Sequence, residues 1–199
     1  MTGFNPLDLE NLADSIARAL LSNSVVPVVG LPRFEGVGIY ALYYTGPFPA
    51  YARMTAANSG GVFGYPIYTG KATTDSTRIG QKSNATKTAL WTRINKHRDS
   101  ISQANNLDVQ DFHVRFLVTE SLWVPLGEAL MINRFQPVWN SLVYGFGSNA
   151  PGAGRKDGRR SRWDTLHPGR PPAAKLQPST ETASQISADV VQYLQTRIP

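Results

Sequence analysis

Residues 37–45 read VGIYALYYT and are followed by Gly46 and Pro47. β-Branched and aromatic residues favour extended backbone, and the Gly-Pro pair ends the run, so this stretch predicts a β-strand. Residues 65–69 predict a shorter second strand. The glycine- and proline-rich stretch at 46–64 predicts a long loop that closes a hairpin between the two strands.

Farther along the chain, the hydrophobic spacing predicts a third strand and two helices. Residues 111–119 alternate between apolar and other side chains, which is the period of a strand. Residues 85–104 carry apolar side chains at helical spacing, and a second helix is predicted from Pro125 to Phe135, ending before Pro137. The order of elements in this part of the chain is therefore β, β, α, β, α.

Two more helices are predicted toward the ends of the chain. Asn5 and Pro6 form a typical helix start, and the apolar residues after them recur at helical spacing to about residue 21. A last helix is predicted at 185–196, after a stretch at 171–184 that is rich in Pro, Ser and Thr and predicts a tether.

The composition excludes several kinds of site. The 199 residues include no cysteine, which excludes disulfides and thiolate metal sites. There is no GxxxxGKS/T phosphate-binding loop, no GxSxG nucleophile motif and no zinc-type spacing among the three histidines. The sequence also lacks a signal-peptide pattern and an apolar run of roughly 18 residues, so a soluble intracellular protein is expected.

The net charge of +6 is concentrated in one segment. Residues 150–175 contain seven basic and two acidic side chains, a surplus of +5. A concentrated basic segment is typical of a nucleic-acid contact, whereas a solvated loop that maintains solubility explains the charge equally well.

Polar residues that can support chemistry are scattered over the predicted elements. Arg93 and His97 are four residues apart, so they share one helical face. His97 lies on the inward side of its helix, where it can meet the tyrosines of the hairpin. Glu128 is expected in the first turn of its helix, where a carboxylate is favoured and can face a cation.

This constellation resembles the GIY-YIG nuclease family over about residues 36–142. Gly38-Ile39-Tyr40 matches the GIY element, and Tyr68-Thr69-Gly70-Lys71-Ala72 matches the YIG-x-A element. Residues 128–140 follow the family's order of a metal-binding Glu, an apolar helix, a proline and a terminal Asn. A competing Tyr44-Thr45-Gly46 comes directly after the first element, and we prefer Tyr68 because Lys and Ala follow its motif.

The spacing of the motifs points to one branch of this family. Tyr40 and Tyr68 are 28 positions apart, and Arg93 is another 25 positions on; both spacings are longer than in most members. Such insertions are similar to those of the restriction enzymes, particularly the SacII isoschizomers, which cut CCGCGG.

The resemblance implies an α+β fold with a small three-stranded antiparallel sheet flanked by helices. Residues 36–142 would form the catalytic core, with insertions at 46–64 and 71–84. Residues 1–35 would supply the N-terminal helix and lead-in, and residues 143–199 a basic irregular DNA-contacting segment, the tether and the C-terminal helix.

The resemblance also implies a type II restriction endonuclease of the bacterial cytoplasm that hydrolyses DNA phosphodiesters with one Mg²⁺ ion per active site. Glu128 would hold the metal, Arg93 would contact the phosphate, and Tyr40 would be the general base. Three further candidates would assist Tyr40 as the base: Tyr68, Lys71 and His97. Asn140 would orient Glu128 or a backbone group.

DNA recognition is expected outside the catalytic core. A palindromic site in double-stranded DNA calls for a homodimer, and arginine is the commonest specific partner of guanine, which suits a GC-rich site. The basic strip expected to contact DNA comprises Arg155, Lys156, Arg159, Arg160, Arg162, Trp163, His167 and Arg170.

Two other functions remain open from the sequence. A homing or repair nuclease would share the catalytic residues but usually carries a separate, extended DNA-binding region. A non-catalytic DNA-binding module would use only the basic segment, and it predicts that Glu128→Ala leaves biological activity intact.

Overall fold

The computed structural model describes residues 8–73, 87–147 and 158–199. Parts of four predictions therefore lie outside the described residues. They are the helix start at Asn5 and Pro6, the part of the second insertion at 74–84, the first two residues of the helix predicted at 85–104, and two members of the basic strip, Arg155 and Lys156.

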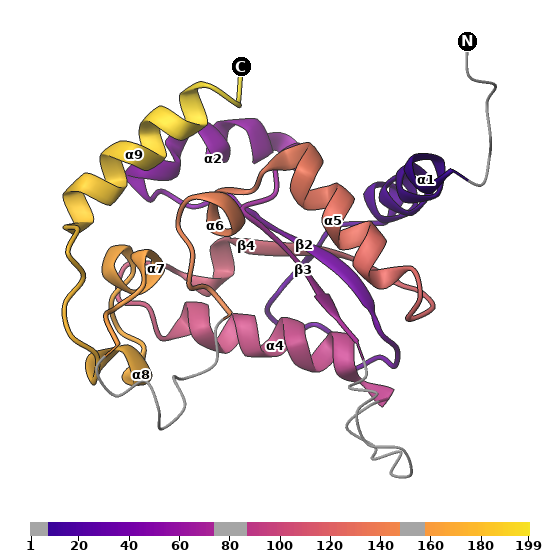
Figure 1. Ribbon diagram of the computed structural model, residues 1–199, viewed down its shortest axis with the longest axis horizontal. Helices are drawn as coiled ribbons and strands as arrows, with labels where there is room; N and C mark the ends of the chain where they lie inside the picture. Colours follow the sequence, from indigo (N-terminus) through magenta and orange to yellow (C-terminus); the bar gives the residue numbers. More distant parts are fainter. Residues whose placement is uncertain (1–7, 74–86, 148–157) are drawn as a thin grey trace.

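A four-stranded antiparallel sheet lies at the centre of the fold, in the order β1-β4-β2-β3 (Figure 1). The three predicted strands are present as β2 (Gly38–Tyr44), β3 (Tyr68–Ala72) and β4 (Phe112–Val118). The predicted bounds of the second strand, 65–69, were wrong: β3 begins three residues later and includes Lys71 and Ala72, which were expected in the second insertion. The expected number of strands was wrong, because β1 (Val26–Pro27) pairs with β4 at the edge. A two-residue strand with a proline, which sheets tolerate at an edge, has no alternating pattern to reveal it.

Helices cover both faces of this sheet (Figure 1). The even-numbered residues of β2 pack on the side of α4 (Ala89–Ser102), whereas the odd-numbered residues pack on the side of α1 (Leu9–Ser22) and α5 (Val124–Phe135). All seven residues of β2 are buried as a result. Burial on both faces explains why the strand is a continuous apolar run instead of an alternating one.

The insertion between β2 and β3 is helical, so the prediction of a long loop at 46–64 was wrong. It contains η1 (Pro49–Tyr51), α2 (Ala52–Asn58) and η2 (Ser59–Gly61). Alanine and methionine in α2 favour a helix. The buried Asn58 amide donates to the carbonyls of Tyr44 and Tyr65 and so closes the insertion at its base.

The C-terminal segment is also more ordered than expected. The stretch predicted as irregular contains α7 (Arg162–Leu166), and the predicted tether begins with α8 (Pro171–Ala174). The last helix is α9 (Ala183–Gln195), which lies along α2 (Figure 1). Apolar side chains of α7 and α9 belong to the same core cluster as β2, and this burial stabilises helices that are too short to form alone.

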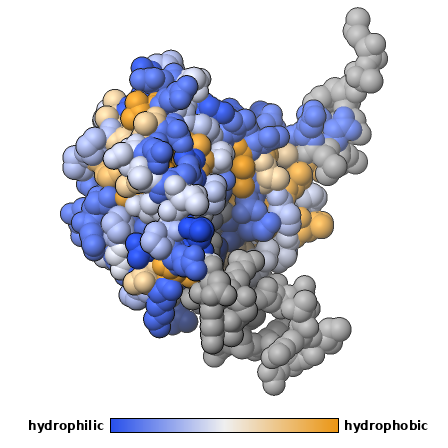
Figure 2. Space-filling model, turned by 60° about the vertical axis from the view of Figure 1, so that its left-hand side comes forward, coloured by the Kyte–Doolittle hydropathy of each residue, from blue (hydrophilic) through white to orange (hydrophobic). Residues whose placement is uncertain are grey.

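Two short helical turns complete the fold, η3 (Val109–Asp111) before β4 and α6 (Val138–Ser141) after α5. No helix within the described ranges is long and apolar enough to span a lipid bilayer. On the face drawn in Figure 2, hydrophobic residues form small separate patches among hydrophilic ones.

Candidate active site

Two tyrosines from neighbouring strands form the centre of the site. In the β2–β3 ladder Tyr40 pairs with Gly70 and Leu42 pairs with Tyr68, so both tyrosines lie on the face that packs against α4. Their ring centroids are 6.2 Å apart. The helical insertion therefore leaves the two motifs adjacent despite their distance in sequence. The competing Tyr44 lies farther along β2, where its hydroxyl accepts from the backbone of Phe48.

Gly70 makes room for the Tyr40 ring. A Cβ atom at this glycine would lie 2.4 Å from the Tyr40 hydroxyl oxygen and 2.9 Å from the Tyr68 ring. Real Cβ contacts are longer than 3.0 Å. Gly70 is the residue of β3 directly opposite Tyr40. Because glycine has no Cβ atom, the phenol can lie this close to the backbone of β3.

Helix α4 places His97 and Arg93 beside the two tyrosines, as their shared helical face predicts. The Tyr40 hydroxyl and His97 Nε2 are 2.5 Å apart and hydrogen-bonded, and both side chains are buried. The His97 ring also packs edge-on against Tyr68, with centroids 5.1 Å apart. Arg93 Nη2 donates to the carbonyl of Gly147 at 3.2 Å. The charge of Arg93 acts on both phenols.

Burial and charge set the protonation of this cluster. Burial raises the pKa of Tyr40 well above 10, and Tyr68 and Glu128 raise it further, while Arg93 opposes them. Burial, with the charges of Arg93 and Arg170, lowers the pKa of His97 well below 6.5. At neutral pH the pair is therefore a phenol and a neutral imidazole, and the tautomer of His97 decides which of the two groups donates the hydrogen bond.

Glu128 approaches the cluster from the opposite face of β3. Its carboxylate forms an ion pair with Lys71 Nζ at 2.8 Å, and its charge raises the pKa of both Tyr40 and Tyr68. The expected place of Glu128 in the first turn of its helix was wrong: α5 begins at Val124, four residues earlier, and has no acidic residue in its first turn. Lys71, and not the end of the helix, is the nearest positive charge for this carboxylate.

Asn140 holds the strand that carries this arrangement. Its side-chain oxygen accepts from the Thr69 amide and its side-chain nitrogen donates to the Thr69 carbonyl, both at 2.8 Å. The structure places Asn140 on a backbone group, which is one of its two expected roles, and not on Glu128. Because β3 is an edge strand, these bonds to α6 replace a neighbouring strand at Thr69.

Phe146 and Gly147 also border the site, although sequence reasoning did not select them. The Phe146 ring stacks on His97 with centroids 4.5 Å apart and contacts Tyr68 at 4.9 Å. Gly147 has a φ of +71°, and a Cβ atom there would lie 2.5 Å from the His97 ring. The signal in the sequence was the pair of glycines around Phe146, because a glycine at positive φ marks a backbone path that other residues rarely adopt.

The predicted basic strip is divided by the structure. Arg159 and Arg160 remain at least partly exposed. The other four described members are buried and contact groups within the protein, so the prediction that they form a DNA-facing surface was wrong: Arg162, Trp163, His167 and Arg170. An arginine can be buried when carboxylates and carbonyls accept hydrogen bonds from its guanidinium group. A count of charges along the sequence does not show which arginines have such partners.

The model of a known protein family matches most of the chain. No curated protein sequence matches the chain. The model of the family described as Eco29kI GIY-YIG domain matches residues 32–194, which include both strands of the hairpin, α4, α5 and Asn140. This match covers well over half of the chain, and the observed β2–β3 hairpin with its two tyrosines agrees with it. The chain therefore belongs to the Eco29kI GIY-YIG family, a family of nucleases of the restriction-endonuclease type.

Proposed function

We propose that this chain is a type II restriction endonuclease that hydrolyses DNA phosphodiesters with one divalent metal ion. The observation that carries the proposal is the convergence of Tyr40, Tyr68, His97 and Arg93 on one face of β3, with the Glu128 carboxylate close enough to act on both phenols. Hydrolysis needs a base for the attacking water, a cation for the phosphate and a Lewis acid for the leaving oxygen. This cluster offers a group for each requirement.

Glu128 fits a magnesium ion better than a transition metal. Within the described ranges, no three His, Asp or Glu residues lie close enough together to form a multidentate metal site. Mg²⁺ is commonly bound by one or two carboxylates together with substrate phosphate and retained water, so a single half-buried carboxylate suits it. When bound, Mg²⁺ would stabilise the charge that develops on the phosphate and on the leaving 3′ oxygen.

Lys71 and Arg93 would share the phosphate. The Lys71 side chain is 41% exposed, so its ammonium group can leave Glu128 and turn to DNA when a metal replaces it on the carboxylate. Arg93 presents a guanidinium group beside the two phenols, and its planar fork matches phosphate oxygens. The two cations would bind the reacting phosphate from two sides of β3.

Tyr40 would take the proton from the attacking water after passing its own proton to His97. The 2.5 Å hydrogen bond provides the path from the phenol to Nε2. Burial, and after it the charge of Arg93, disfavours an imidazolium in the free protein. A DNA phosphate next to Arg93 would offset that charge, so substrate binding would favour the transfer. The base would then form mainly when DNA is in place.

The target is proposed to be a palindromic, GC-rich site in double-stranded DNA, CCGCGG in particular, cut by a homodimer. This part of the proposal rests on the long insertions in the motif spacing and on the symmetry that a palindrome requires. Sequencing the ends of plasmid fragments, produced with and without Mg²⁺, tests it. Discrete fragments with palindromic ends support restriction, whereas rare or damage-dependent nicking would support a homing or repair nuclease.

Glu128→Gln tests the catalytic assignment. The substitution keeps the shape of the side chain but removes the charge that a metal needs, so cleavage should fall by several orders of magnitude while DNA binding persists. Glu10→Gln, at an exposed carboxylate on α1, is the matched control and should cut at the parent rate. If Glu128→Gln also cuts at the parent rate, the metal assignment is wrong. If the parent binds DNA but never cuts it, the chain is a binding module.

A further inference from the structure

The segment 142–147, here called the covering segment, closes one side of the catalytic cluster. Its Phe146 ring stacks on His97 at an interplanar angle of 23°, and its Gly147 carbonyl accepts from Arg93. Phe146 is 6% exposed, so it separates the imidazole from solvent. Any displacement of this segment would move the surroundings of two candidate catalytic side chains.

The backbone of the covering segment is held from the C-terminal layer. It contains no strand and no regular helix. Three of its carbonyls accept hydrogen bonds from that layer instead: Leu142 from Arg162 Nη1, Tyr144 from the Trp163 amide and Gly145 from Arg170 Nη2, each at 3.1 Å. The path of the segment therefore depends on two buried guanidinium groups and on the start of α7.

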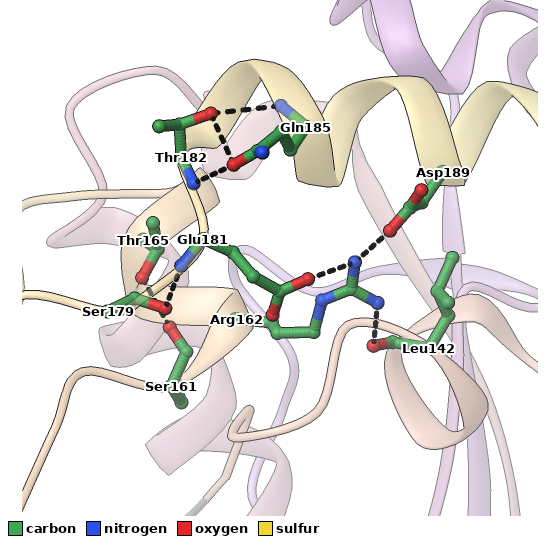
Figure 3. Close-up of polar contacts among 9 residues, drawn as sticks. All are labelled: Leu142, Ser161, Arg162, Thr165, Ser179, Glu181, Thr182, Gln185 and Asp189. Carbon is green, nitrogen blue, oxygen red and sulfur yellow. Dashed lines mark hydrogen bonds and ion pairs between the residues drawn. The ribbon is translucent and has the colours of Figure 1, made fainter.

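Each of the two arginines is itself fixed by carboxylates. Arg170 binds Asp164 through two parallel bonds, Nε to Oδ1 at 2.7 Å and Nη2 to Oδ2 at 2.9 Å, and its guanidinium lies over the Trp163 ring. Arg162 reaches Glu181 at 3.0 Å and also contacts Asp189 on α9 (Figure 3). Bidentate and multiply paired guanidinium groups have few alternative positions, so they transmit the position of α7 and α9 to the carbonyls.

We propose that Arg162 and Arg170 are positioning residues for the catalytic cluster. By holding the carbonyls of Leu142 and Gly145, they keep the Phe146 ring on His97 and the Gly147 carbonyl on Arg93. The inference rests on the proposed nuclease function and deepens it, because it makes the C-terminal layer part of the catalytic apparatus. The charge of Arg170 also helps to keep His97 neutral, which supports the same coupling.

Arg170→Lys tests this coupling with little damage to the fold. Lysine keeps the positive charge beside Asp164 but lacks the planar fork that reaches the Gly145 carbonyl. Arg53→Lys is the matched control, since Arg53 also donates to a carbonyl, that of Ile198, but does not contact the covering segment. Phe146→Leu is a second variant that removes the stacking on His97 while leaving both arginines in place.

Two measurements separate the positioning role from the nuclease function. The first is the single-turnover cleavage rate at saturating DNA and Mg²⁺, together with DNA affinity. The second is the side-chain ¹⁵N NMR spectrum of His97 in the free protein, which reports its tautomer and needs no activity. For Arg170→Lys and Phe146→Leu we expect the rate to fall about ten- to a hundredfold, with unchanged DNA affinity and shifted His97 resonances.

The alternative outcomes are distinct. Unchanged cleavage and unchanged His97 resonances in Arg170→Lys would overturn the inference, as would a loss of DNA affinity without a change in the saturated rate. If Arg170→Lys does not fold, Arg162→Lys is measured instead, and its results have the same meaning. If the parent protein does not cut DNA, the proposed function fails, but the His97 resonances still decide whether the arginines position the cluster.

Discussion

Replacing Gly70 with alanine should disable catalysis while leaving most of the fold intact. The added Cβ would lie 2.4 Å from the Tyr40 hydroxyl oxygen and 2.6 Å from its Cζ atom, whereas ordinary contact begins at 3.4 Å. The Tyr40 ring or β3 must therefore move by about 1 Å. Asn140 holds β3 on its other side, so the ring is the part that moves.

The size of that displacement sets the expected effect. Taken along the bond to His97, a shift of about 1 Å would stretch a hydrogen bond of 2.5 Å to about 3.5 Å, its outer limit. Overpacking a buried site costs about 1–3 kcal/mol of stability, and a misplacement of about 1 Å at a catalytic group costs roughly a hundredfold in rate. The rate should thus fall much more than the folded fraction does.

Single-turnover cleavage and thermal unfolding, measured on the same preparation, check this prediction. Gly64→Ala is the matched control, since a Cβ atom there meets its nearest neighbours at 3.6 and 3.8 Å and should change neither quantity. This prediction is refuted if folded Gly70→Ala protein cuts at the parent rate. It is also refuted if the loss of activity only follows the loss of folded protein.

Two further predictions concern pH. Because the pKa of Tyr40 is raised well above 10 and that of His97 is lowered well below 6.5, the pair keeps one proton from pH 7 to 9, and its transfer from Tyr40 to His97 does not depend on pH. The single-turnover rate should therefore stay level from pH 7 to 9, and Tyr40→Phe should abolish it. A rate that rises about tenfold per pH unit over this range would argue against transfer to His97. Burial lowers the pKa of His167 to about 3 in the folded protein. As pH falls below 6.5, the imidazole is therefore protonated in the unfolded chain but stays neutral in the folded protein. The neutral imidazole is hydrogen-bonded to Tyr51 and Asn106. Its contribution to the free energy of unfolding is therefore fully present above pH 6.5. That contribution is lost as pH falls from 6.5 toward 3, by roughly 5 kcal/mol in total. Urea unfolding at several pH values should show a shallower acid loss in His167→Gln than in the parent, and equal slopes would contradict this assignment.

Several features of this protein follow from its sequence alone. The strands of the hairpin, the third strand and the main helices are encoded in local hydrophobic periodicity, which a short window of residues reveals. Arg93 and His97 share a face because a helix repeats every 3.6 residues, and the motif order around Tyr40 and Glu128 suffices to suggest the family. These properties depend on neighbours in sequence, so no tertiary contact is needed to predict them.

Other features depend on which distant residues meet, and the tertiary structure alone decides them. Burial and paired partners turn Arg162 and Arg170 from expected DNA contacts into internal supports, because a carboxylate 6 or 27 residues away satisfies each guanidinium. The register of β3 on β2 places Gly70 opposite Tyr40, and the chain after α6 brings Phe146 onto His97. Local propensity carries no information about such long-range pairings, since their free energy comes from burial and hydrogen bonds that exist only once the chain has folded.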